Sequence, residues 1–276
     1  MKPEERDPPA RTTDSGAPSR DADAARHELA TLAPPRADDC AAVAAFAGRV
    51  AEAAAGAADA ELQPHRTALR VVQAAIRAEA AADALMDRSP DRARRACQAG
   101  CSFCCHIAVS LTVPEALRIA AELRATRTAE DLRRVRDRIA SVSARVSALS
   151  LEERAKARTA CALLGADGAC TIYEFRPLGC RSWTSLARDD CERAFERNEP
   201  GHRGAQDKVG YVAACAVTEG LERGLRAAGL DAAQYEFHSA VLRALDDEQA
   251  AERFAAGERV FAGCARVWSG AHAHAR

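Results

Sequence analysis

The run CQAGCSFCC, residues 97–105, places four cysteines within nine residues: Cys97, Cys101, Cys104 and Cys105. Four more cysteines follow in a segment that contains glycine and proline and shows no clear helical period: Cys161, Cys170, Cys180 and Cys191. A Cys-x-x-Cys turn such as Cys101–Cys104 brings two sulfur atoms to one metal ion with little strain. We therefore expect residues 97–202 to form a cysteine-cluster metal-binding domain, in which the irregular segment 161–202 is held together by metal.

The segment before this cysteine-rich stretch has apolar residues at helical spacing. Val43, Phe46 and Val50 form one stripe. Leu69, Val72 and Ile76 form a second stripe, so residues 37–96 are expected to be an antiparallel pair of helices. Residues 1–36 combine prolines with charged residues and few large apolar side chains, and we expect them to be disordered.

The sequence predicts two helix N-termini in the cysteine-rich half of the chain. The sequence TVPE at 112–115 combines a capping box with a proline in the first turn, and SLEE at 150–153 is a second capping box. Between them, apolar residues from Leu132 to Leu149 follow a three-four alternation that predicts one helix with a single apolar seam.

Residues 203–276 are expected to add helices that pack on the same domain, including one that carries Phe254, Phe261 and Trp268. No run alternates between apolar and polar residues for long enough to predict a strand. The fold class is therefore mainly α: a helical bundle with an irregular, cysteine-rich, metal-stapled insert. Aromatic residues make up only 4% of the chain, so its core must rely on close contacts between helices.

Composition and charge bear on the compartment and on possible partners. The chain has 39 basic and 40 acidic residues and a formal net charge of -1, which gives no electrostatic argument for nucleic acid or an anionic membrane. The first residues lack an apolar signal sequence, and charged residues interrupt the apolar stretch 41–62. We expect a cytosolic protein without a membrane span, whose thiols are reduced and available for metal; a protein partner is possible but unidentified.

The eleven cysteines divide into two classes. The eight clustered ones are candidate metal ligands: Cys97, Cys101, Cys104, Cys105, Cys161, Cys170, Cys180 and Cys191. The isolated Cys40, Cys215 and Cys264 are expected to be small core residues. Adjacent side chains project in different directions, so Cys104 and Cys105 are not expected to serve one tetrahedral site equally. The eight thiols could form two four-sulfur sites, or one cluster with spare thiols.

The spacing favours an iron–sulfur cluster, of the 4Fe-4S kind, over zinc. Zinc ribbons repeat the Cys-x-x-Cys turn in both halves, whereas a cluster several ångströms across reaches distant thiolates. Arg176 and Arg181 flank Cys180 and are expected to offset the negative charge of such a centre. His106, next to Cys105, is a further candidate ligand. The spacing of Cys97, Cys101 and Cys104 also occurs in radical S-adenosylmethionine enzymes, but the strands and helices of their barrel are not predicted here.

The two cysteine motifs together resemble a known family. CQAGCSFCC at 97–105, CALLGADGACTIYEFRPLGCRSW at 161–183 and then Cys191 are similar to the YkgJ-type cysteine-cluster family of zinc- or iron-chelating CxxCxxCC domains. This chain has one extra residue between Cys97 and Cys101. The resemblance implies metal binding and names no activity. Two further functions stay open: an iron–sulfur-dependent enzyme of electron transfer or protein modification, and a structural zinc module on a helical platform.

Overall fold

The computed structural model describes residues 20–63, 65–98, 100–197, 205–264 and 266–268. Within these residues helices dominate, so the expected mainly α fold is confirmed. The α-helices are α1 (Arg20–Thr31), α2 (Cys40–Leu62), α3 (Ala68–Asp87), α4 (Val113–Thr126), α5 (Ala129–Ser147), α6 (Leu151–Ala157), α7 (Leu178–Arg181), α8 (Arg188–Arg197), α9 (Lys208–Ala227), α10 (Phe237–Asp246) and α11 (Ala250–Ala255). Short 3-10 turns η1 (Arg92–Arg94), η2 (Phe103–His106) and η3 (Tyr173–Phe175) occur around the cysteines.

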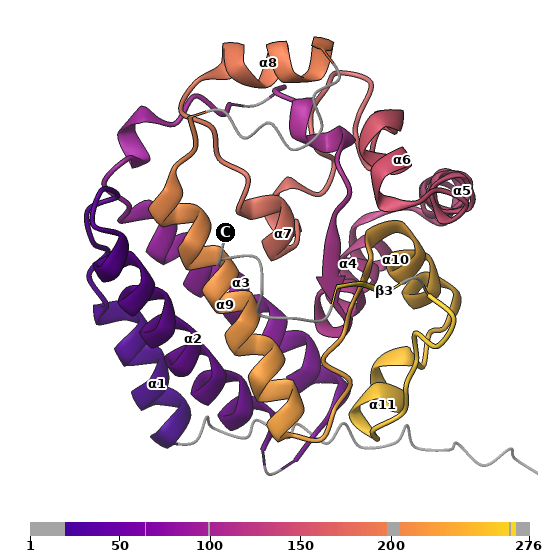
Figure 1. Ribbon diagram of the computed structural model, residues 1–276. Helices are drawn as coiled ribbons and strands as arrows, with labels where there is room; N and C mark the ends of the chain where they lie inside the picture. Colours follow the sequence, from indigo (N-terminus) through magenta and orange to yellow (C-terminus); the bar gives the residue numbers. More distant parts are fainter. Residues whose placement is uncertain (1–19, 64, 99, 198–204, 265, 269–276) are drawn as a thin grey trace, which may run out of the picture.

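One half of the molecule is a bundle of α1, α2, α3 and α9 (Figure 1). The predicted stripe of α2 is buried, with Phe46 and Val50 fully covered. The predicted stripe of α3 is wrong in part: Val72 packs half-buried against the core, but Leu69 is 63% exposed and Val71 is buried. The buried face of this helix includes Ala74, Ala75 and Ala82, which a search for large apolar residues does not detect. The main neighbour of α2 is α9, which follows the cysteine-rich segment in sequence.

The expected disorder of residues 1–36 is corrected in part. Residues 1–19 lie outside the described residues, but residues 20–31 form α1, which packs against α2. Leu29 of α1 is buried, and Arg88 of α3 donates hydrogen bonds to the carbonyl oxygens of Leu29 and Ala30 at 3.1 and 2.7 Å. One buried leucine and these carbonyl contacts supply the interactions that the composition alone did not predict.

By length and composition, α2 is the helix of the described residues that could cross a membrane. In the structure it packs against α1, α3 and α9. Its contact with α9 is close because Gly220 and Gly224 of α9 face the backbone of α2. A Cβ atom added at Gly220 would lie 2.6 Å from the carbonyl oxygen of Ala51 and 2.9 Å from the nitrogen of Ala55.

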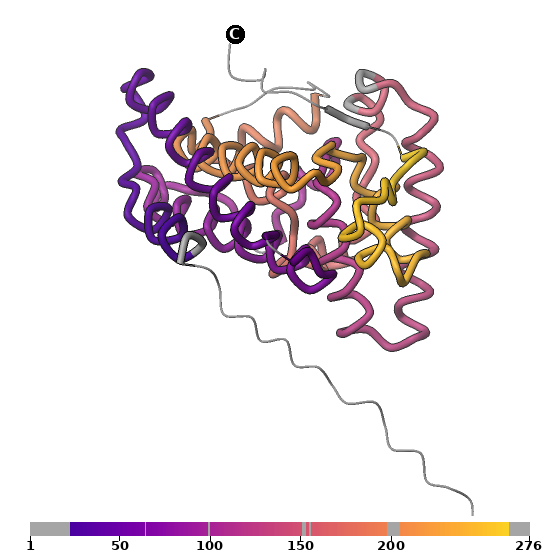
Figure 2. Tube along the Cα trace, turned by 90° about the horizontal axis from the view of Figure 1, so that it is seen from below, coloured from indigo at the N-terminus to yellow at the C-terminus, as the bar shows by residue number. Residues whose placement is uncertain are grey.

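The other half contains α4, α5 and α10 and a small antiparallel sheet of β1 (Ser110–Thr112), β2 (Gln234–Glu236) and β3 (Arg266–Trp268) in the order β1-β2-β3. Figure 2 shows the N-terminal helices at one end of the molecule and α5 with α11 at the other. The sequence predicted no strand, and each strand has only three residues, too few to show a period of two.

The helix starts in this half agree with the sequence, and its last helix does not. Thr112 and Ser150 are the N-caps of α4 and α6, each with a capping box. The prediction that one helix carries Phe254, Phe261 and Trp268 is wrong. The helix at this place is the short α11, which contains Phe254 alone of the three. Gly257 follows α11 with φ 95°, and Trp268 lies in β3. A residue in this left-handed region commonly ends a helix.

Replacing Gly220 by alanine tests the close contact of α2 and α9. Alanine forms helices better than glycine, but here its methyl group meets backbone atoms that have no room to move. Gly220→Ala is expected to lower the free energy of unfolding by about 1–3 kcal/mol. The control is Gly48→Ala on the exposed face of α2, where nothing lies within 4 Å; it is expected to raise the free energy of unfolding by about 0.5–1 kcal/mol. Urea denaturation measures both, and equal effects would contradict the close contact.

Candidate metal centre

The two cysteine segments meet although α4 and α5 separate them in sequence. The N–H of Cys161 donates a hydrogen bond to the carbonyl oxygen of Cys105 at 2.8 Å. Beyond Cys161 the chain folds back on itself: Leu164 pairs with Cys170 in an antiparallel bridge, and Gly168, with φ 77°, makes the turn between them. Two distant motifs are thus joined by backbone hydrogen bonds.

The short helix α7 brings Cys180 to the same place. Figure 1 shows α7 near the middle of the molecule. Its first residue, Leu178, donates its N–H to Glu115 Oε1 of α4 at 2.7 Å. Its second residue, Gly179, lies against β1, because an added Cβ atom would be 2.9 Å from the carbonyl oxygen of Ser110. The absence of a side chain at Gly179 lets α7 approach the sheet and fixes the position of Cys180.

The eight predicted cysteines line two adjoining pockets. The larger is a cavity of about 420 Å³, which we call the thiol cavity; it is lined by Cys101, Cys104, Cys105, Cys161, Cys170 and Cys180. The smaller pocket, of about 60 Å³, is lined by Cys97, Cys101, Cys104 and Cys191. Cys104 borders both pockets, whereas its neighbour Cys105 borders the cavity alone. This is the difference in direction expected for adjacent side chains.

The thiols surround these pockets without converging on one point. Among the described residues, no three Cys, His, Asp or Glu side chains are placed to hold a single metal ion as they stand. All eleven cysteines are free thiols. The group nonetheless differs from a core of buried cysteines, because six of its thiols share one cavity.

Burial is the main cause of the raised pKa values of Cys161, Cys170 and Cys180. It raises the pKa of Cys161 to about 11 and raises the pKa of Cys180 well above its ordinary value. The pKa of Cys170 is also raised, first by burial, while the positive charge of Arg176 acts in the opposite direction. A metal that binds thiolates here must therefore displace protons, so its affinity is expected to rise with pH.

The two arginines near Cys180 have different roles. Arg176 lines the thiol cavity, its guanidinium lies 4.0 Å over the ring of Tyr173, and its buried Nε makes no hydrogen bond. Arg181 was also expected to offset the charge of the centre, but it is buried in ion pairs with Glu79 and Asp83 of α3 and does not line the cavity. Arg181 anchors α7 to the bundle, and Arg176 is the cation available to the thiols.

Two other predicted residues lie elsewhere. His106 contacts the carbonyl oxygen of Ser102 through Nδ1 at 3.1 Å and the ring of Phe195 at 4.9 Å, and it lines neither pocket. Cys40 was expected in the core but is exposed at the first turn of α2, where its sulfur lies 3.4 Å from Lys208 Nζ. Its position at the end of the helix places it beyond the buried stripe.

A buried polar group that the sequence did not reveal borders the thiol cavity. His238 lines the cavity, its Nε2 accepts the N–H of Ala162 at 3.3 Å, and its Nδ1 lies 2.9 Å from Glu236 Oε1. Arg154 of α6 lies 2.9 Å from the same carboxylate oxygen. Glu236 and His238 lie far in sequence from the eight clustered cysteines, and no motif marked them.

The ion pairs of Glu236 with His238 and Arg154 can be tested through the pH dependence of the free energy of unfolding. Burial alone would raise its pKa, but His238, the N–H of Ser239 and Arg154 together lower it from 4.5 to about 2. The stabilisation of the fold by the ionised carboxylate of Glu236 is therefore complete above pH 4.5 and is lost as the pH falls toward about 2. Glu236→Gln is expected to lower the free energy of unfolding by about 3 kcal/mol at pH 7 and by less at pH 3.

Urea denaturation at both pH values measures this difference. The control is Glu130→Gln, which removes an exposed partner of Arg134 on α5 and is expected to change stability by about 0.5 kcal/mol or less. A loss for Glu236→Gln that is the same at pH 7 and pH 3 would show that its ionisation does not stabilise the fold.

The comparison with known proteins agrees with this arrangement. Neither a curated protein nor a solved structure shows a significant match to the chain. A family model does match residues 96–200: CxxCxxCC, described as a putative zinc- or iron-chelating domain. The match includes all eight clustered cysteines, and the YkgJ-type name is consistent with it. Residues 96–200 of this chain are therefore similar to the CxxCxxCC family of domains.

Proposed function

We propose that this domain binds an iron–sulfur cluster, of the 4Fe-4S kind, in the thiol cavity. The observation that supports the proposal is the placement of six thiols around about 420 Å³ with no three of them directed at one ion in the described residues. A zinc ion needs four ligands on one centre, with each sulfur about 2.3 Å away. A cluster is held at its corners and suits thiols that are spread around a cavity.

The surroundings of the sulfurs suit a bound anion. Backbone N–H groups point at two of them: Ser185 N lies 3.3 Å from Cys97 Sγ, and Leu163 N lies 3.5 Å from Cys161 Sγ. The unpaired Nε of Arg176 adds a positive charge at the wall of the cavity. Hydrogen bonds and charges of this kind stabilise thiolates and tune the potential of a cluster. We place the protein in the cytosol, where its thiols would stay reduced.

The small pocket would serve the remaining thiols. Cys97 and Cys191 meet Cys101 and Cys104 there, and a pocket of about 60 Å³ has room for a single ion and not for a cluster. The thiols would have to close around such an ion, because they do not converge as they stand. The cluster in the thiol cavity and the ion in the small pocket would then contribute separately to the metal content.

A second candidate function is an enzyme that depends on the cluster. It is favoured by the cavity wall, where His238 and Arg176 stand beside the apolar side chains of Ile107, Trp183 and Phe237. Polar groups in an otherwise apolar cavity are typical of a site for a small molecule. The structure names no substrate, so metal binding remains the principal proposal.

The metal itself tests the proposal. Protein purified without oxygen is expected to be brown, to absorb near about 400 nm and to contain iron with acid-labile sulfide. The double variant Cys101→Ser, Cys104→Ser is expected to lose this absorbance and most of the iron. The control is Cys215→Ser in α9, which removes a cysteine that lines neither pocket and should keep both. A colourless protein with stoichiometric zinc would overturn the cluster. Unchanged metal content in the double variant would overturn thiol ligation.

The division of the thiols between two pockets can be tested with paired variants. Cys170→Ser with Cys180→Ser removes two thiols that line only the cavity, and it is expected to abolish the absorbance of the cluster. Cys97→Ser with Cys191→Ser removes two thiols that line only the small pocket, and it is expected to keep that absorbance. Visible spectra and iron analysis of both, with circular dichroism to verify folding, provide the measurement. If both pairs abolish the absorbance in folded protein, the eight thiols act as one site.

A further inference from the structure

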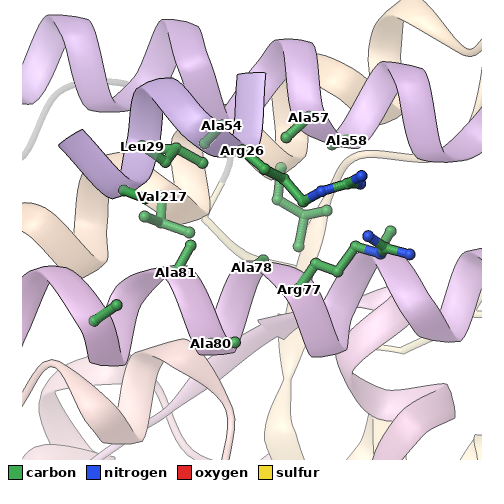
Figure 3. A pocket seen from close by; sticks show the side chains of 14 residues that line it. Arg26, Leu29, Ala54, Ala57, Ala58, Arg77, Ala78, Ala80, Ala81 and Val217 are labelled. Carbon is green, nitrogen blue, oxygen red and sulfur yellow. The ribbon is translucent and has the colours of Figure 1, made fainter. Parts of the chain in front are cut away.

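A second hollow lies in the helical bundle, away from the cysteines. It has a volume of about 260 Å³ and lies between α1, α2, α3 and α9 (Figure 3). No residue that lines it also lines the thiol cavity. Its wall is apolar apart from Arg26 and Arg77. The other lining residues are Leu29, Ala30, Ala54, Ala57, Ala58, Ala74, Ala78, Ala80, Ala81, Ala84, Val217 and Leu221.

The hollow exists because small side chains line helices that do not close on one another. Ala57 and Ala58 on α2 oppose Ala78 and Ala81 on α3, and Figure 3 shows the methyl group of Ala81 directed toward Val217. Ala54 and Ala58 of α2 also border Gly220 and Gly224 of α9, where the backbones of α2 and α9 come into contact. The bundle is thus closely packed on one side of α2 and open on another. An apolar cavity of this kind stays dry and accepts apolar ligands.

The charged groups at the hollow lie together at one end. Figure 3 shows the guanidinium groups of Arg26 and Arg77 on the same side of the space. Arg77 is paired with Glu61, whose Oε2 lies 2.7 Å from Arg77 Nε. Arg26 contacts Asp23 through Nη2, but its Nη1 is buried and has no hydrogen-bond partner in the structure. A buried N–H donor without an acceptor is costly, so this end of the hollow favours a ligand that supplies a negatively charged oxygen.

We propose that this hollow binds the acyl chain of a fatty acid, with its carboxylate on Arg26. The apolar wall would cover the chain, and the carboxylate would accept the free N–H of Arg26 at the end where both guanidinium groups lie. A methylene group is similar in size to a water molecule, whose share of liquid volume is about 30 Å³, so the space suits a single chain of roughly eight or nine carbons. The inference is independent of the metal centre.

The direct test is calorimetric titration of the purified full-length protein with octanoate and, in parallel, with octanol. Octanoate is expected to bind at one site per chain and at least tenfold more tightly than octanol, because only octanoate offers an anionic acceptor to Arg26. Equal affinities would overturn the assignment of the carboxylate to Arg26. Absence of binding by either ligand would overturn the site.

Two variants locate the bound molecule. Arg26→Gln is expected to weaken octanoate about tenfold and to leave octanol unchanged, with Arg49→Gln on an exposed position of α2 as its control. Ala81→Leu fills the hollow and is expected to weaken both ligands at least tenfold, with Ala45→Leu on an exposed position of α2 as its control.

Circular dichroism and thermal unfolding establish that each variant is folded. If Arg26→Gln fails to fold, Arg26→Lys, which keeps the charge and should retain most of the affinity for octanoate, replaces it. Binding unchanged by Ala81→Leu would overturn the proposed site. Sedimentation that shows a dimer, broken by Ala81→Leu, would also overturn it, because a second copy of the chain would then cover the hollow.

Discussion

One buried carboxylate, that of Glu115, joins the helical frame to the cysteine-rich segment. Its Oε2 accepts the N–H and the hydroxyl of Thr112, both at 2.8 Å, and so fixes the junction of β1 and α4. Its Oε1 accepts the N–H of Leu178 at 2.7 Å and so fixes the start of α7. Burial raises the pKa of Glu115, and these three donors, with the charge of Arg181, act to keep it ionised. The position of Cys180 depends on this contact, because Cys180 lies on the four-residue helix that Glu115 caps.

The local part of this arrangement could be predicted, because it is set by neighbours in sequence. The pattern TVPE fixes the start of α4 through contacts between residues three apart, and SLEE does the same for α6. The contact of Glu115 with Leu178 spans 63 residues and has no sequence signal. The strands β1 and β2 depend on pairing between residues more than 120 apart, such as Ser110 with Glu236, and could not be predicted from a local period.

The same distinction applies to the candidate site. The cysteines could be identified as a group because their spacing is local within each motif, and the structure places both motifs around adjoining pockets. The roles of the flanking arginines could not be identified, since both stand close to Cys180 in sequence. Arg181 is on α7 and faces Glu79 of α3, while Arg176 precedes that helix and faces the cavity. His238 comes from a distant strand–helix junction, and only the tertiary fold brings it to the thiols.

Alanine has opposite effects in the two parts of the bundle. Beside Gly220 and Gly224, small side chains let α2 and α9 approach until backbone atoms touch. Between α2 and α3, the same residue type leaves a hollow of about 260 Å³. A chain with only 4% aromatic residues gains less from burial per residue than one whose core is built of large side chains. A ligand bound in such a hollow would therefore add stability that the side chains do not provide, and metal binding to the thiols would couple to folding for the same reason.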